Sequence, residues 1–134
     1  MNITGYDQYK ENSVYTASPE ELTYMLYNGL VKFIMKAQHA ISKKDMELAN
    51  ESILKAQAIV TELISTLDDK YEIAASLTLL YDYMLRRLID ANVQKSAEIL
   101  DEVLDFAKDL RDTWEQAMKI ARKQLKNSAT AAGI

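Results

Sequence analysis

The residue types that could do chemistry are few in this chain of 134 residues. It has one histidine, His39, and no cysteine, so thiolate nucleophiles, thiolate metal sites and disulfides are excluded. A two-metal carboxylate site in a helical bundle needs Glu-x-x-His on two helices, and the sequence contains no such motif. It also lacks a nucleophile elbow and a glycine-rich phosphate loop. We therefore predict no enzyme activity, no catalytic residue, no metal site and no cofactor.

The charged clusters are best explained as solvent-exposed helix faces. An acidic stripe recurs at Asp101, Asp105, Asp109 and Asp112. It could bind a cation or do acid–base work, but it lies opposite an apolar heptad, as a solvated helix face would. Arg86 and Arg87 could grip an acidic partner, yet consecutive helical residues point about 100° apart. Ion pairs with nearby acids are therefore expected for both arginines.

Composition predicts one globular and largely helical domain. Apolar residues make up 49% of the chain and charged residues 27%, and three glycines with one proline are too few for the turns of an all-β protein. The net charge of −4 argues against non-specific nucleic-acid binding. No apolar run approaches membrane-spanning length, and the first residues, "MNITGYDQYKEN", lack a secretory core. We therefore expect a cytoplasmic protein with no nucleic-acid partner and no membrane insertion.

Four amphipathic helices should carry the remaining side chains. The first has Ser18 as N-cap, Pro19 at its first position and Glu21 completing a capping box. Asp45 should cap the second helix, and Asp69 with Glu72 could form a capping box for the third. Each helix should bury a stripe of apolar residues spaced three and four apart. These stripes are Leu22, Met25, Leu26, Gly29, Leu30, Phe33, Ala37, Ile41; Met46, Ala49, Ile53, Ala56, Val60, Leu63, Leu67; Ala74, Leu77, Tyr81, Met84, Leu88, Ala91; and Leu100, Val103, Ala107, Leu110, Trp114, Ala117, Ala121.

Links of two to five residues between these helices favour antiparallel neighbours. We therefore predict an all-α, antiparallel up-down-up-down four-helix bundle over residues 18–126. The fourth helix could run for ~48 Å against ~35 Å for the others, so that its last turns project beyond the bundle. The last residues, 127–134, have no apolar pattern and should form a flexible tail.

A short amino-terminal segment, residues 1–17, precedes this bundle. Its aromatic and apolar residues Tyr6, Tyr9, Val14 and Tyr15 stand in a polar stretch that is too short to hold a stable helix alone. These side chains need a surface to rest on, so we predict a reversible cap that lies on the bundle.

More apolar residues are present than one core stripe per helix requires. Those outside the stripes include Tyr24, Val31, Met35, Ile59, Leu80 and Tyr83. Tyr24, Val31 and Met35 should lie on roughly the opposite side of the first helix from its core stripe. A broad core can absorb part of this surplus, and the remainder predicts an exposed apolar patch that binds a partner.

Three segments resemble the signatures of one family. "YTASPEELTYMLYNGLVKF" at residues 15–33 contains the pattern ASPxEL followed by MLYxG, "LYDYMLRRLIDAN" spans 80–92, and "FAKDLRDTWEQA" spans 106–117. Together they resemble, in order and spacing, the FliS family of flagellin-specific export chaperones. The resemblance extends from Tyr9 to about Met118.

The resemblance implies an antiparallel helical bundle whose amino-terminal segment covers a hydrophobic surface. It implies a cytoplasmic protein that binds the disordered carboxy-terminal segment of flagellin, prevents premature polymerisation and delivers flagellin to the flagellar type III export gate. An amino-terminal tyrosine contributes to function in the family; Tyr9 matches it best and Tyr6 less well. The family's signature positions fall on Leu26, Tyr27, Leu80, Tyr81, Met84, Leu88 and Asn92.

These two lines of inference give one set of predicted partner-binding residues. They are Tyr6, Tyr9, Tyr15, Tyr24, Leu26, Tyr27, Val31, Ile59, Leu80, Tyr81, Tyr83 and Met84. The expected oligomeric state is a monomer or a weak homodimer. Without the motifs, the residue pattern equally fits a helical adaptor or a secretion chaperone for a different client.

Overall fold

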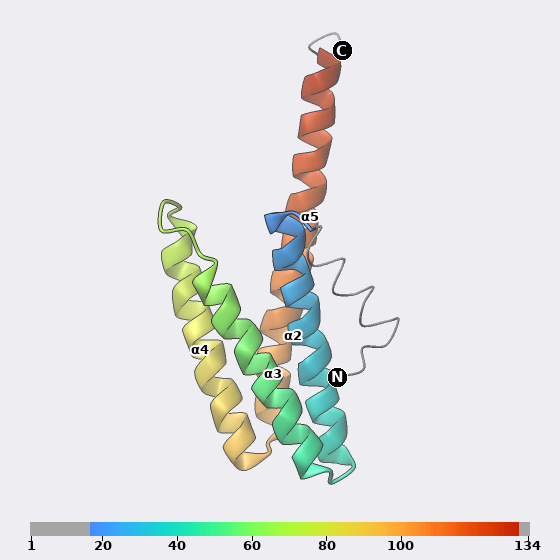
Figure 1. Ribbon diagram of the computed structural model, residues 1–134, viewed down its shortest axis with the longest axis vertical. Helices are drawn as coiled ribbons and strands as arrows, with labels where there is room; N and C mark the ends of the chain where they lie inside the picture. The colour runs from blue at the N-terminus through green and yellow to red at the C-terminus, as the bar shows by residue number, and fades with distance from the viewer. Residues whose placement is uncertain (1–16, 132–134) are drawn as a thin grey trace, which may run out of the picture.

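Four α-helices and no β-strand make up residues 17–131, the part of the chain that the computed structural model describes (Figure 1). The helices are α2 (Pro19–Ser42), α3 (Met46–Ser65), α4 (Ile73–Gln94) and α5 (Ala97–Ala131). The predicted all-α, four-helix fold is therefore confirmed. The first 16 residues, which hold nearly all of the predicted cap, and residues 132–134 lie outside the described part.

The four helices pack in a ring. α2 contacts α3 and α5, and α4 contacts the same two helices from the other side. Figure 1 shows the chain reversing its direction at each of the three links, and α3 and α4 diverging from α2 and α5 toward the α3–α4 link. That link spans residues 66–72 and is longer than predicted.

Local side-chain caps explain where the first two helices begin. The Ser18 hydroxyl accepts a hydrogen bond from the Glu21 amide at 3.2 Å, and Pro19 occupies the first helical position. The Asp45 carboxylate accepts from the Leu48 amide at 3.1 Å. Both caps confirm the sequence prediction.

The capping box predicted from Asp69 and Glu72 is wrong. α4 begins at Ile73, and Glu72 precedes it in a helical conformation with no side-chain cap hydrogen bond. Asp68 instead accepts a hydrogen bond from the Lys70 amide at 3.0 Å, a local turn that competes with helix formation. This turn lengthens the α3–α4 link.

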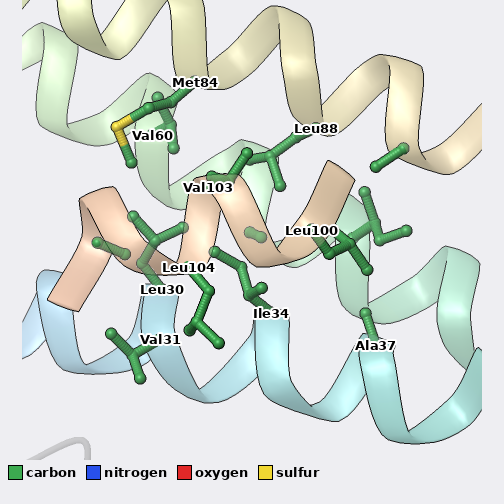
Figure 2. Packing of buried hydrophobic residues seen from close by; sticks show 14 of the residues in the cluster. Leu30, Val31, Ile34, Ala37, Val60, Met84, Leu88, Leu100, Val103 and Leu104 are labelled. Atoms are coloured by element: carbon green, nitrogen blue, oxygen red, sulfur yellow. The ribbon is translucent and has the colours of Figure 1, made fainter. Parts of the chain in front are cut away.

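The core lies along the centre of the ring, and most predicted stripe positions in α3, α4 and the first half of α5 are buried. Figure 2 shows Val60, Met84, Leu88, Leu100 and Val103 converging there. Among the exceptions, Met46 at the start of α3 is exposed, and so are Ala117 and Ala121 in the second half of α5, whereas Leu67, Leu77 and Leu110 are half-buried.

The predicted stripe of α2 is displaced from the face that the structure buries. Ile34 is fully buried and Val31 is only 6% exposed, although Val31 was predicted to face away from the core. Leu22, Met25 and Phe33 are only half-buried. The reason is that α2 packs against both α3 and α5, so its buried face points between them. Leu104 of α5 points toward Val31 and Ile34 (Figure 2).

One polar contact crosses this apolar core. The hydroxyls of Tyr27 on α2 and Tyr81 on α4 are hydrogen bonded at 2.5 Å, and both side chains are 2% exposed. Burial raises the pKa of both tyrosines, so both are neutral at pH 7. Each hydroxyl is the hydrogen-bond partner of the other, which lets two polar groups be buried in an apolar interior.

Truncating Ile34 should test the buried face of α2. Ile34→Ala should lower the free energy of unfolding by ~2–5 kcal/mol, because it removes a fully buried side chain and leaves a cavity. The matched control is the neighbouring Met35→Ala, which should change it by less than about 0.5 kcal/mol since Met35 is 50% exposed. Urea unfolding measures both; equal effects would contradict the packing described above.

The tyrosine pair should be energetically coupled. Tyr27→Phe and Tyr81→Phe should each cost ~1–3 kcal/mol of unfolding free energy, because each leaves the other hydroxyl buried without its partner. The double variant removes both hydroxyls and should cost clearly less than the two single effects together. Strictly additive effects in a urea double-mutant cycle would show that the hydrogen bond contributes no stability.

Candidate functional site

A cavity lies at the end of the bundle where α2 begins. Its volume is about 520 Å³. Its wall is formed by residues of α2, α4, α5 and the α3–α4 link, most of them aromatic or aliphatic: Pro19, Tyr27, Leu67, Tyr71, Ile73, Ala74, Leu77, Tyr81 and Trp114, with Glu20, Thr23, Thr66 and Asp68. A cavity of this size and composition fits apolar side chains of a bound segment.

The cavity exists because the α3–α4 pair and the α2–α5 pair are not closely packed at this end. α3 and α4 diverge here from α2 and α5 (Figure 1), and the link 66–72 joins them. On the opposite wall, the Trp114 indole donates a hydrogen bond to the Glu20 carbonyl at 3.0 Å. This bond fixes α5 to the first turn of α2 and satisfies the indole N–H, so the Trp114 ring can line the cavity.

Trp114 is half-buried rather than enclosed in the core as its heptad position predicted. Its ring meets the Tyr27 ring edge-on, with centroids 6.2 Å apart and planes at 69°. Edge-to-face packing of this kind is a favourable aromatic geometry. Together with Tyr27 and Tyr81, it forms a rigid aromatic wall that needs little ordering when a partner binds.

The cavity is uncharged inside and acidic at its rim. The hydroxyls of Tyr27 and Tyr81 are paired with each other, and burial keeps both groups neutral at pH 7. The acidic side chains that line the cavity are Glu20 and Asp68, and both residues are exposed. The site therefore favours apolar groups in its interior.

A second cluster of predicted site residues lies between α4 and α5. The Tyr83 hydroxyl donates to a Glu102 carboxylate oxygen at 2.9 Å, and the Arg87 guanidinium donates to the same oxygen at 2.9 Å. The Tyr83 ring packs edge-on against Phe106, with centroids 6.1 Å apart. These contacts hold the half-buried Tyr83 in one position beside the half-buried Leu80.

The same network sets the charge state of this cluster. The hydrogen bond to Glu102 raises the pKa of Tyr83, while hydrogen bonds from Tyr83 and then Arg87 lower the pKa of Glu102. Tyr83 is therefore neutral and Glu102 ionised at pH 7. The cluster therefore presents the Arg87–Glu102 ion pair beside the rings of Tyr83 and Phe106.

The other predicted site residues lie apart from these two places. Ile59 packs against α2 at Gly29, where an added Cβ would stand 3.2 Å from the Ile59 Cδ1 atom. Leu26 packs against the core and Tyr24 is half-buried. Gly29 thus allows close approach of α3 to α2.

Four predicted site residues are almost or fully inaccessible in this structure, and Tyr27 and Tyr81, which border the cavity, are each only 2% exposed. Val31 is 6% exposed and Met84 is fully buried. Neither can contact a partner unless the helices separate, because each faces the centre of the ring. Tyr6, Tyr9 and Tyr15 lie outside the described residues, so their role stays a prediction.

Sequence reasoning missed Tyr71 and Ile73 as wall residues. Both are strongly exposed, at 66% and 64%, and both follow the polar turn after α3. The available signal was an apolar pair at the end of a polar link, with Tyr71 inside the link and Ile73 at the first position of α4. Trp114 and Leu77 were predicted, but as core residues.

Within residues 17–131, no three His, Asp or Glu side chains come together as metal ligands would. In the same range, no helix is both long enough and apolar enough to cross a bilayer.

Comparison with known proteins agrees with the motifs. The sequence profile of a family described as "Flagellar protein FliS" matches residues 2–121. The "Flagellar secretion chaperone FliS" of Bacillus subtilis (strain 168) is 47% identical over 127 residues, which cover 95% of this chain and 96% of that protein. The protein of the same name from Salmonella typhimurium (strain LT2) is 34% identical over 109 residues, covering 79% of this chain and 81% of its own.

A solved structure shares the fold. The "Crystal structure of flagellar chaperone from bacteria" superposes with a TM-score of 0.71 at 21% identity, covering 85% of this chain and 94% of that one. The profile match and the two relatives span most of the sequence, and the profile match includes all three signature segments. The chain therefore belongs to the FliS family.

Proposed function

We propose that this chain is a cytoplasmic flagellar export chaperone that binds the disordered carboxy-terminal segment of flagellin. By holding that segment it prevents premature polymerisation, and it delivers flagellin to the flagellar type III export gate. The observation that carries the proposal is the aromatic cavity beside Trp114, in a chain whose relatives are named flagellar secretion chaperones. The family's role is protein binding, and we assign the chain no catalytic activity.

The cavity suits a client that is disordered when free. Such a client loses chain entropy on binding, so a large burial of apolar surface must offset that loss. Leu77 and Trp114 offer this surface, and the buried Tyr27 behind them is fixed by its hydrogen bond to Tyr81. The hydrogen bond of Trp114 to the Glu20 carbonyl fixes the other side of the wall. Apolar side chains of the client would enter the cavity, and the cluster at Tyr83 would extend the contact along α5.

We propose that the amino-terminal segment regulates this site. Residues 1–17 lead directly into Ser18, and Pro19 and Glu20 line the cavity. A segment attached at the rim can reach the cavity whichever way it folds back, since an extended chain covers ~3.3–3.6 Å per residue. We propose that this segment caps the antiparallel up-down-up-down bundle when no client is bound, with Tyr6, Tyr9 and Tyr15 resting on its apolar surface.

The full chain should bind flagellin 1:1 through the carboxy-terminal segment. Calorimetry should show a negative heat-capacity change from apolar burial and a favourable enthalpy opposed by ordering entropy. Trp114→Ala should raise the Kd at least tenfold because it removes an aromatic anchor. The matched control is Leu54→Ala, whose side chain is 50% exposed on α3 and lines no part of the cavity.

Two results would contradict this assignment. Equal binding of flagellin that lacks its carboxy-terminal segment would place the contact elsewhere on the client. Equal weakening by Trp114→Ala and Leu54→Ala would place it away from the cavity. Binding of an unrelated export client instead would favour the general adaptor.

Deleting residues 1–13 should speed association with the client. If the cap covers the cavity, only a fraction of the free protein is competent to bind, and the apparent Kd rises by the inverse of that fraction. Stopped-flow mixing with a labelled flagellin peptide should therefore give a higher on-rate for the truncation. An on-rate equal to or below that of the full chain would rule out an autoinhibitory cap, and a faster off-rate would show that Tyr6 or Tyr9 contacts the client directly.

A further inference from the structure

The second half of α5 extends past the bundle. The last fully buried residue of this helix is Ala107, and every residue from Lys119 to Thr130 is exposed. Figure 1 shows this end of α5 running beyond the start of α2. Residues 115–130, called the projecting segment below, therefore form a helix of about four turns with almost no support from the other helices. Most helices of this length depend on a packed apolar face.

The projecting segment has such a face. Ala117, Met118, Ala121 and Leu125 recur at intervals of three and four residues, in line with the buried face of the same helix inside the bundle. Leu125 is 74% exposed and Met118 is half-exposed. Met118, Ala121, Arg122 and Leu125 form one wall of an open groove of about 240 Å³, whose other wall is Ser18, Glu20 and Glu21.

Cations border this apolar stripe on one side. The projecting segment contains Lys119, Arg122, Lys123 and Lys126 against the single carboxylate of Glu115, in a chain whose net charge is −4. At 3.6 residues per turn, all four cations fall on one edge of the stripe, while Gln124 and Ser128 mark the other edge. Of these four cations, all of which lie in the described part of the chain, only Lys119 forms an ion pair, with the Glu115 carboxylate at 3.4 Å.

We propose that the projecting segment is a second interaction surface, which adjoins the cavity at Glu20 but contains none of its aromatic wall, and that it binds an amphipathic helix bearing carboxylates along one edge. The apolar stripe would pack against the partner's apolar face, and the small side chains of Ala117 and Ala121 would let the two helices approach closely. The cations would pair with the partner's carboxylates and fix its direction. The partner is thus an acidic protein segment rather than the flagellin site proposed for the cavity.

Two other occupants fit the same features less well. A second copy packed antiparallel would bring four cations against four like cations, and one packed parallel would set them against the edge of Gln124 and Ser128, which offers no carboxylate. A membrane-surface helix carries bulky residues such as Trp, Phe and Leu with cations on both sides of its apolar face. Here half of the stripe is alanine and one edge is uncharged. The charge pattern therefore favours the acidic helix.

The test measures the fluorescence anisotropy of a labelled synthetic peptide as the full chain is added. The peptide is an amphipathic helix with a leucine face and glutamates along one edge of that face. Its control is the same peptide with lysine for glutamate. The acidic peptide should bind and the lysine peptide should not. Arg122→Glu with Lys126→Glu should weaken binding at least tenfold, because two attractive contacts become repulsive. The matched control, Lys32→Glu with Lys36→Glu, has the same i, i+4 spacing on exposed positions of α2 and should leave the Kd unchanged.

Binding of the flagellin carboxy-terminal segment is measured on the same variants and should not change in either. Loss of flagellin binding in every protein, including the unaltered chain, would refute the proposed function but not this surface. The inference is overturned if the acidic peptide does not bind or if both double variants weaken binding equally. It is also overturned if the chain instead binds vesicles of anionic lipid and Arg122→Glu with Lys126→Glu abolishes that binding. The same holds if the chain self-associates and this double variant abolishes the self-association.

Discussion

The hydrogen bond between Tyr27 and Tyr81 separates the packed core from the open cavity. On one side of it lie Leu30, Met84 and Leu88, which are fully buried. On the other side the same two rings form part of the cavity wall. The two hydroxyls hydrogen bond to each other, so neither requires a water molecule or a charged group as its partner. The pair can therefore remain buried among apolar side chains. The bundle can therefore keep an unfilled end without exposing the rest of its core.

Much of the fold follows from local signals. In α3 and α4 a regular heptad of apolar residues stands out among the others, so Ile53, Val60, Met84 and Leu88 were assigned to the core correctly. In α2 the apolar residues surround much of the circumference, and counting them does not reveal the buried face. Val31 was misplaced because its burial depends on Leu104 and its neighbours in α5, which lie far away in the sequence (Figure 2).

The candidate site was predictable only in part. The motifs named Tyr27 and Tyr81, but nothing local shows that their hydroxyls meet across the core. The cavity depends on the contact from Trp114 to the Glu20 carbonyl, which joins residues at opposite ends of the chain. It depends equally on the turn at Asp68, which delays the start of α4 and leaves Tyr71 outside any helix. Such long-range contacts are set by packing rather than by periodicity.

The continuity of α5 has a consequence for local stability. Backbone amides near Leu100 and Val103 open only when the core is disrupted, whereas those near Leu125 can open by fraying of the helix end. Hydrogen exchange along this single helix would therefore pass from strong to weak protection without any break in secondary structure. A partner bound near Leu125 would suppress this fraying and extend strong protection toward the end of α5. Binding at the end of the helix would thereby also stabilise the turns around Trp114.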